Sequence, residues 1–276
     1  MSRFDFRIRT GEIYNILQIP YVVDADAQLF YNRVLSAGGS LSSTEQIAVN
    51  QLIINLKNNG LWSLMKAIYP MVGSSAAACS QNLKSSSFTG TFTSGWTYSS
   101  TGVKPNGTSA YMSTGLNPST ALTNNNYHLT HYSRTQKTTG TEVDLGAISP
   151  VPVMISLSQY YAGAGKAFVA GDYNTSVIIN SSATNTLGFQ VNTRITQTSA
   201  KIFFNNSQIG STLTLSNPNN LPNTILSLGS NYNTSPYEFS SKQCAFASVG
   251  DGLTDIQASN LYTIVQNFQT ILGRQV

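Results

Sequence analysis

The sequence has few charged residues and few cysteines and histidines. Charged side chains make up 9% of the 276 residues, against about 25% in an average soluble domain, so a surface built on ion pairs is excluded. The two cysteines, Cys79 and Cys244, are too few for a disulfide framework or a zinc site. We expect two buried, reduced thiols, and a single bridge between them stays open because it depends on a geometry that the sequence does not show. Hydrophobic residues at 41% exclude a disordered chain.

The positive net charge comes from a shortage of acids. There are 11 acidic and 15 basic residues, and no two basic residues are adjacent. A nucleic-acid binder usually shows a basic stripe, so we expect no nucleic-acid partner. No carboxylate occurs between Gln46 and Thr141, which leaves that stretch without an acid for catalysis.

Membrane and export signals are also missing. Nothing approaches the run of about eighteen apolar residues that a membrane span needs, so we expect no membrane partner. The first residues lack the apolar core and small-residue cleavage site of a secretion signal. We therefore expect a protein made in the cytoplasm, with no metal or other cofactor.

Residues 1–24 form an N-terminal arm. Basic and aromatic residues alternate at its start, in the order Arg3, Phe4, Phe6, Arg7 and Arg9. Such a segment either adds a strand to its own domain or extends onto a partner, and both alternatives stay open. We expect this arm to be the docking segment of the chain.

Residues 25–72 are predicted to be helical. A first helix over 25–35 ends at a pair of glycines, and Ser42 with Glu45 has the spacing of a capping box that starts a second helix. A third, short helix is predicted over 61–68, ending before Pro70 because residues that precede proline avoid helical geometry.

Residues 73–250 are predicted to be an antiparallel β-sandwich of the jelly-roll type, and the whole chain mainly β. Short alternating or apolar runs recur between Ser-, Thr-, Asn- and Gly-rich turns. The predicted strands are 87–93, 110–114, 127–134, 151–159, 166–172, 176–180, 186–192, 201–205, 211–215, 224–230 and 243–249.

Residues 251–276 are predicted to be a C-terminal helix that packs back on the core. Thr254 and Gln257 can form a second capping box. Leu261, Val265 and Phe268 then recur at helical spacing, which predicts one apolar stripe.

Two further patterns suggest catalysis but lack an essential part. His128 and His131 lie in a strand-like run, where residues three apart point to opposite faces, so they make a poor metal site. Glu142 and Asp144 are similar to the start of the Glu-x-Asp-x-Glu motif of laminarinase-like glycosidases, but Gly146 stands where the acid/base belongs. We expect this pair to be solvated or bonded to a turn. No nucleophilic serine motif occurs.

Tyrosine and asparagine gather in several turns, which favours carbohydrate binding. Aromatic rings stack on sugar rings while amides bond their hydroxyls, although asparagine also serves ordinary turns. The candidate sugar-binding residues are Tyr127, Tyr160, Tyr161, Asn231 and Tyr232.

Two family resemblances follow from particular segments. Residues 201–210 and 221–230 resemble the hairpin and following strand of concanavalin A-like/laminin-G-like jelly rolls, with Asn205 and Asn206 where that family usually has Asn-Gly. Residues 24–28, 59–73, 94–107 and 250–255 resemble tailed-bacteriophage virion proteins. This second likeness covers most of 24–276 and implies a structural, adhesin-like virion component with no catalytic residues.

These resemblances imply the following functions. The first is a virion structural protein (fibre, capsid decoration or tail appendage) that docks on capsid, portal or tail proteins, forms a homo-oligomer and exposes its jelly roll. The second, compatible with it, is attachment to a host-surface glycan. A free carbohydrate-binding protein and a glycan hydrolase remain as alternatives.

Overall fold

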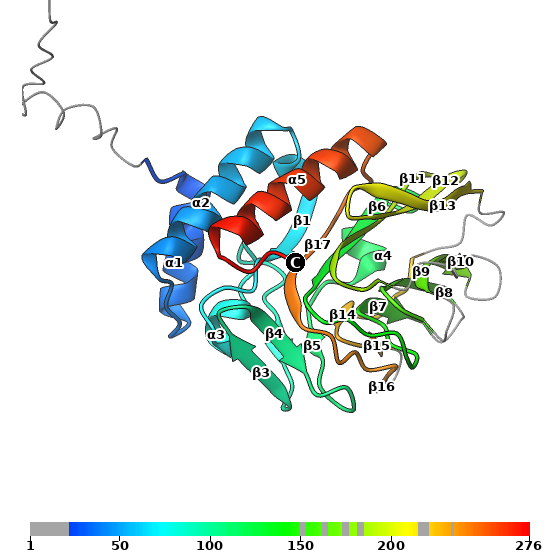
Figure 1. The fold of residues 1–276 in the computed structure, drawn as a ribbon, viewed down its shortest axis with the longest axis horizontal. Coiled ribbons are helices and arrows are strands. Elements are labelled where there is room, and N and C mark those ends of the chain that lie inside the picture. The colour runs from blue at the N-terminus through cyan, green and yellow to red at the C-terminus, as the bar shows by residue number, and fades with distance from the viewer. Residues whose placement is uncertain are drawn as a thin grey trace, which may run out of the picture.

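The computed structural model describes residues 22–149, 153–161, 165–172, 177–180, 185–214, 221–232 and 235–276. The predicted docking residues Arg3, Phe4, Phe6, Arg7 and Arg9 lie outside this part of the chain. Figure 1 shows helices packed along one side of a β-sandwich. The predicted fold, a mainly β antiparallel sandwich with helices at both ends of the sequence, is confirmed.

The described strands form two large antiparallel sheets. The eight-stranded sheet runs in the order β13 (Ser207–Leu213), β12 (Ser199–Phe204), β11 (Gly188–Thr196), β6 (Tyr127–Ser133), β17 (Cys244–Gly250), β4 (Gly102–Pro105) and β3 (Trp96–Ser99), with β1 (Met65–Tyr69) beside β17. The seven-stranded sheet runs in the order β10 (Val177–Asn180), β9 (Lys166–Asp172), β8 (Val153–Ser158), β7 (Leu145–Ile148), β14 (Ser227–Leu228), β5 (Met112–Ser113) and β2 (Thr91–Phe92). A small pair, β15 (Asn231–Tyr232) and β16 (Pro236–Tyr237), stands apart.

The main core lies between the two large sheets. Alternate residues of facing strands supply it, including Leu129 of β6, Leu145 of β7, Leu157 of β8 and Phe168 of β9, all at most 2% exposed. Because side chains alternate across a strand, the residues between these ones point to the outer faces of the sheets. On the eight-stranded sheet these outward-facing residues, such as Phe246, meet the helices.

Helices α1 (Ala25–Ser36), α2 (Ser43–Asn58) and α5 (Asp255–Ile271) cover the outer face of the eight-stranded sheet (Figure 1). Both predicted capping boxes are present, Ser42 with Glu45 and Thr254 with Gln257. A second core joins the two layers, in which Phe268 of α5 meets Phe246 of β17 edge-on, with ring centroids 6.2 Å apart. Three shorter helical turns complete the described fold: η2 (Trp62–Leu64), α3 (Ala76–Cys79) and α4 (Pro118–Ala121).

The predicted helix over 61–68 is wrong. Only the short turn η2 is helical, and β1 follows it and pairs with β17, Ala67 opposite Val249. Four of the five residues of β1 are buried, and a short apolar run of this kind is typical of a fully buried strand as well as of a helix. The pairing with β17 decides between them, so the predicted helical segment contributes a strand to the sandwich.

Two smaller predictions are confirmed. Asn205 and Asn206 form the turn between β12 and β13 with φ values of 45° and 69°, the left-handed geometry of a type I′ turn. Cys79 and Cys244 are both buried and both free.

The two histidines lie on β6 and face opposite layers, as predicted. Nδ1 of His128 lies 2.6 Å from the carbonyl oxygen of Asp251, and Nδ1 of His131 lies 3.3 Å from Oε1 of Gln159. Both partners are acceptors here, because the Gln159 amide nitrogen already donates to backbone carbonyls. Both imidazoles therefore carry a proton on Nδ1 and donate it to an acceptor inside the fold.

These buried imidazoles make stability depend on pH. Burial lowers the pKa of His128 to about 4 and also lowers the pKa of His131. In the unfolded chain a histidine takes up its proton near pH 6.5, so between that pH and pH 4 the unfolded state binds more protons. We expect His128 alone to reduce the free energy of unfolding by about 3 kcal/mol as the pH falls from 7 to 4.

Urea denaturation at a series of pH values measures this effect. The variant His128→Asn, whose amide can donate in place of Nδ1, should lose much of the pH dependence between 6.5 and 4. A variant that keeps the full wild-type slope in this range would rule out His128 as its source.

Candidate functional site

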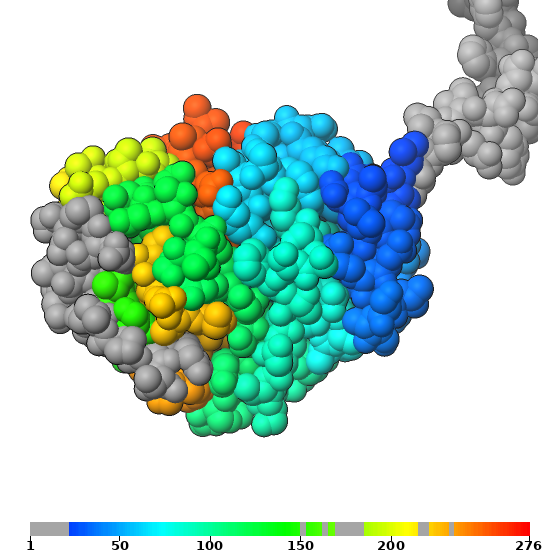
Figure 2. Space-filling view, turned by 180° about the vertical axis from the view of Figure 1, so that it is seen from behind, coloured from blue at the N-terminus to red at the C-terminus, as the bar shows by residue number. Residues whose placement is uncertain are grey.

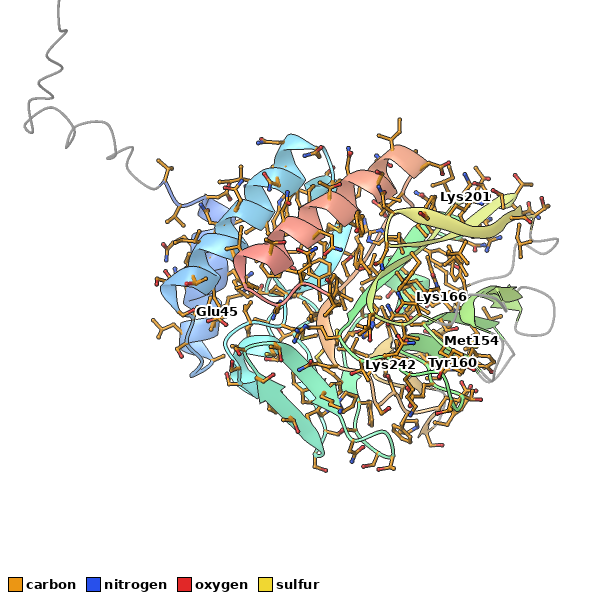
Figure 3. The ribbon with its side chains drawn as sticks, viewed as in Figure 1. Glu45, Met154, Tyr160, Lys166, Lys201 and Lys242 are labelled. Carbon is orange, nitrogen blue, oxygen red and sulfur yellow. The ribbon has the colours of Figure 1, made fainter. Side chains whose placement is uncertain are left out.

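The candidate site lies on the outer face of the seven-stranded sheet, on the side away from the helices. Strand β15 lies against β7, and the Asn231 amide nitrogen of β15 lies 3.6 Å from the Met154 sulfur of β8. Here the buried Val143 and Met154 form a separate apolar cluster with the partly buried Ile148 and Tyr161. Figure 3 shows Met154 and Tyr160 on this side of the sandwich, and Glu45 among the helices at the other.

Four residues meet at this face, and we call them the tyrosine–glutamate cluster: Tyr161, Asn231, Tyr237 and Glu238. The Tyr161 hydroxyl donates to Oε1 of Glu238 at 3.1 Å. The Asn231 amide nitrogen donates to the Tyr237 hydroxyl at 3.0 Å and lies 3.4 Å from Oε2 of Glu238. Asn231 is fully buried while Tyr237 is 37% exposed, so the cluster has a fixed base and an accessible aromatic edge.

Glu238 has a raised carboxyl pKa and a left-handed backbone conformation within this cluster. Burial raises the pKa of its carboxyl group, and the hydrogen bonds from Tyr161 and Asn231 offset that rise only in part. Its backbone has φ 53°, a left-handed geometry that costs a side-chain-bearing residue energy. Because the carboxyl group of Glu238 contacts both Tyr161 and Asn231, we take it as the centre of the candidate site.

The structure brings together two of the predicted sugar-binding residues, Tyr161 and Asn231. Tyr160 is half-buried next to Tyr161. Tyr232 forms β15, but its side chain lies outside the described part of the structure. The prediction for Tyr127 is wrong: it is fully buried between the sheets and packs edge-on against Phe168, because its alternation on β6 points it into the core.

Sequence reasoning missed Tyr237 and Glu238. The available signal was a carboxylate beside a tyrosine, closely following the asparagine-rich turn that contains Asn231. Nothing in the spacing along the chain indicates that Tyr161, seventy-odd residues earlier, donates to that carboxylate.

Behind the cluster lies a buried ionic network formed by Lys137, Glu142, Asp144 and Lys242. The Lys242 ammonium donates to Oε2 of Glu142 at 2.8 Å and to Oδ1 of Asp144 at 3.0 Å. Lys137 pairs with the other oxygen of Glu142. Lys242 and Asp144 are fully buried, whereas Lys137 is 30% exposed. Two ammonium and two carboxylate groups thus balance one another inside the fold.

The network keeps its carboxylates ionised. Burial alone would raise the pKa of Asp144, but the Lys242 ammonium and hydrogen bonds from Ser240 and the Gln159 backbone outweigh it and hold the pKa below its usual value. The pKa of Glu142 is lowered for the same reasons. Burial would lower the pKa of Lys242, but the two carboxylates raise it.

The expectation that Glu142 and Asp144 are solvated is wrong, because both are buried and bonded to the irregular segment 240–242. Their carboxylates do share one side, but that side is the interior, where Lys242 meets both. Position 146 favours glycine, because a Cβ there would lie only 2.7 Å from Val143 Cγ1 and 2.9 Å from Asn231 Oδ1. Residue 146, where the glycosidase motif has its acid/base carboxylate, is therefore packed against Asn231, the buried member of the tyrosine–glutamate cluster.

Two searches of the described residues give negative findings. No group of three or more His, Cys, Asp or Glu side chains is placed to hold a metal ion. Within the same ranges, every helix is too short or too polar to cross a membrane.

Comparison with known proteins shows a likeness of fold. The chain matches domain 4 of AbnA, an extracellular arabinanase from Geobacillus stearothermophilus, with a TM-score of 0.55 and 15% identity over 72% of this chain and 98% of that domain. It matches a sialidase mutant of Trypanosoma rangeli with a TM-score of 0.51 and 12% identity, over 81% of this chain. It spans only 39% of that sialidase.

The shared feature is an antiparallel β-sandwich. Identities this low show the fold alone. No protein-family model matches the sequence, and no curated protein sequence does so either.

Proposed function

We propose that the chain binds glycans through the tyrosine–glutamate cluster. The observation that carries this proposal is the convergence of two tyrosines, a carboxyl group and a buried amide on one sheet face. The exposed edge of the Tyr237 ring offers an apolar surface for the C–H face of a sugar, and Glu238 offers charge-assisted hydrogen bonds to hydroxyls. Asn231 and Tyr161 fix both groups before the sugar arrives.

The comparisons support this assignment. The arabinanase domain with the similar sandwich was solved with arabinotriose bound. A small number of polar groups fixed beside aromatic side chains is also typical of ligand sites in general.

Binding to a glycan array tests the proposal. We expect saturable binding of the full chain, and Tyr237→Ala should weaken it about tenfold because the aromatic contact is lost. The matched control Tyr237→Phe keeps the ring and removes only the hydroxyl that accepts from Asn231, so it should bind nearly as well as the wild type. A blank array, or equal binding by the alanine variant, would reject this site.

We propose further that this module belongs to a tailed-bacteriophage virion. The resemblance of residues 24–28, 59–73, 94–107 and 250–255 to such proteins supports the assignment. The arm of residues 1–24 would dock on capsid, portal or tail proteins, and the sandwich would face a host-surface glycan. In this proposal the chain is a homo-oligomer, is made in the host cytoplasm and ends in the virion.

Mass spectrometry of purified particles tests the virion role separately. The chain should be present in particles, and deletion of residues 1–23 should leave a folded protein that is no longer incorporated. Absence from particles together with a positive array would favour the alternative, a free carbohydrate-binding protein.

Binding without hydrolysis is the third part of the proposal. Glu142 and Asp144, the residues that suggested a glycosidase, are occupied by Lys242 inside the fold. If hydrolysis of an array glycan were detected and Glu142→Gln abolished it while the protein stayed folded, this part would be overturned.

A further inference from the structure

A groove opens at the β3–β4 hairpin, and Ser241, three residues after Glu238, forms part of its wall. It has a volume of about 410 Å³, within the range of small-ligand sites. Its lining includes Gly95, Thr97, Lys104, Asn106, Thr135 and Ser241. We call it the Lys104 groove.

The walls of the groove are held in place by the fold. Asn106 Oδ1 accepts hydrogen bonds of 3.0 Å from the three backbone N–H groups of residues 108–110. Gly95 has φ 93°, and a Cβ there would lie 2.4 Å from Asn106 Nδ2, so glycine allows this close approach. On the other side Ser241 donates to Glu142 at 2.8 Å and accepts from Lys137 at 2.8 Å. The ionic network therefore fixes this wall.

The groove carries positive charge. Lys104 is exposed, and it has no ion-pair partner among the residues that the structure describes. The lining contains no carboxylate, and none occurs in the sequence between Gln46 and Thr141. The carboxylate closest behind the wall, Glu142, is 5% exposed and already paired with Lys137 and Lys242. An anion entering the groove would meet an ammonium group and no repelling charge.

One short segment joins the groove to the tyrosine–glutamate cluster. Tyr237 and Glu238 belong to the cluster, and Ser241 lines the groove only three residues beyond Glu238. Four residues span at most about 14 Å when fully extended, so Tyr237 and Ser241 lie within reach of one oligosaccharide.

We infer that the Lys104 groove is a second subsite for a carboxylate-bearing sugar of the same glycan chain. This inference rests on the proposed function and narrows it to acidic oligosaccharides and polysaccharides. The sugar carboxylate pairs with Lys104, while its hydroxyls bond to Thr97, Asn106 and Ser241. The cluster holds a neighbouring sugar of the chain on Tyr237.

The test uses alginate, polygalacturonate and polysialic acid, each beside its carboxyl-reduced form, and the full chain. We expect at least one acidic polymer to bind about three- to fivefold more tightly than its reduced form, since an exposed ion pair contributes up to about 1 kcal/mol. The preference should shrink as salt is raised. Lys104→Gln should abolish it, and Lys104→Arg should retain it.

The control variant is Lys201→Gln, which removes an amino group that pairs with Asp255 and is not part of the groove lining. It should leave the preference intact. Equal binding of acidic and reduced polymers, or a preference that survives Lys104→Gln, would overturn the second subsite. If Tyr237→Ala still weakens binding in that case, the proposed function stands; if none of the polymers and no array glycan binds, both fail.

Discussion

Replacing Lys242 with methionine is expected to lower the free energy of unfolding by about 3–5 kcal/mol, because it leaves buried carboxylates without their shared cation. Lys242 is fully buried and lies 3.0 Å from Asp144 and 2.8 Å from Glu142. Methionine fills a similar volume, so the loss reports charge and hydrogen bonding and not a cavity. Urea denaturation measures it as a lower midpoint with an unchanged slope.

The matched control is Lys137→Met. Lys137 pairs with the same Glu142 but is 30% exposed, and water can replace it, so we expect a loss of about 1 kcal/mol or less. Adding Asp144→Asn to Lys242→Met should recover part of the stability, because it removes one of the stranded charges. Equal losses in the two lysine variants would contradict the burial argument.

Lys242→Met should also change how the free energy of unfolding depends on pH. In the wild type the pKa of Asp144 lies below its unfolded value, so its contribution to stability is present above about pH 4 and is lost as the pH falls through the folded pKa. Without Lys242, burial is no longer outweighed and the pKa of Asp144 rises. The stability difference between wild type and variant should therefore narrow as the pH falls, beginning above pH 4, where Asp144 takes up a proton in the folded variant but not in the folded wild type. A constant difference down to pH 2 would contradict this account.

The second large effect is expected for Arg274→Lys. The Arg274 guanidinium is 1% exposed and donates to the backbone carbonyls of Pro70, Met71 and Ala245 and to the Gln269 side chain, at 2.6–2.7 Å. It thereby joins the C-terminal end of the chain to the segment after β1 and to β17. Lysine keeps the charge but cannot reach these acceptors together, and each unsatisfied buried group costs about 1–3 kcal/mol. We expect a loss of about 3–5 kcal/mol in total.

Arg33→Lys provides the comparison for this variant. Arg33 also donates to two backbone carbonyls, those of Asn82 and Leu83, but it is only partly buried. We expect a loss of about 1 kcal/mol or less there. If chemical denaturation gives the two variants the same midpoint, the buried position of Arg274 does not carry the energy assigned to it.

Local sequence signals predicted the elements that depend on local chemistry. The capping boxes at Ser42 and Thr254 and the Asn205-Asn206 turn satisfy backbone groups within a few residues, so the sequence alone identifies them. Strand β1 depends on pairing with β17, almost two hundred residues away, and its apolar run fits a helix equally well. Only the pairing with β17 decides whether this run forms a strand or a helix.

The candidate site was predicted in part for the same reason. Tyrosine and asparagine in turns pointed to Tyr161 and Asn231, but composition does not say which turns meet. Glu238 joins them only because β15, which pairs with β16, lies against β7. Tyr127 shows the opposite failure, since the sugar-binding prediction ignored the strand alternation that buries it.

Figure 2 shows the face of the molecule opposite to that of Figure 1. Figure 2 shows α1 and α2 in blue at one end, and the strands of the sandwich in green at the other. The helices α1 and α2 and the green strands thus occupy different parts of this face.

The most direct test of glycan binding is a crystal structure of the full chain soaked with the oligosaccharide that binds best on the array. The account predicts one sugar ring packed against Tyr237, with a hydroxyl within hydrogen-bond distance of the Glu238 carboxyl group. A saccharide bound at another face of the molecule, with the tyrosine–glutamate cluster untouched, would contradict it.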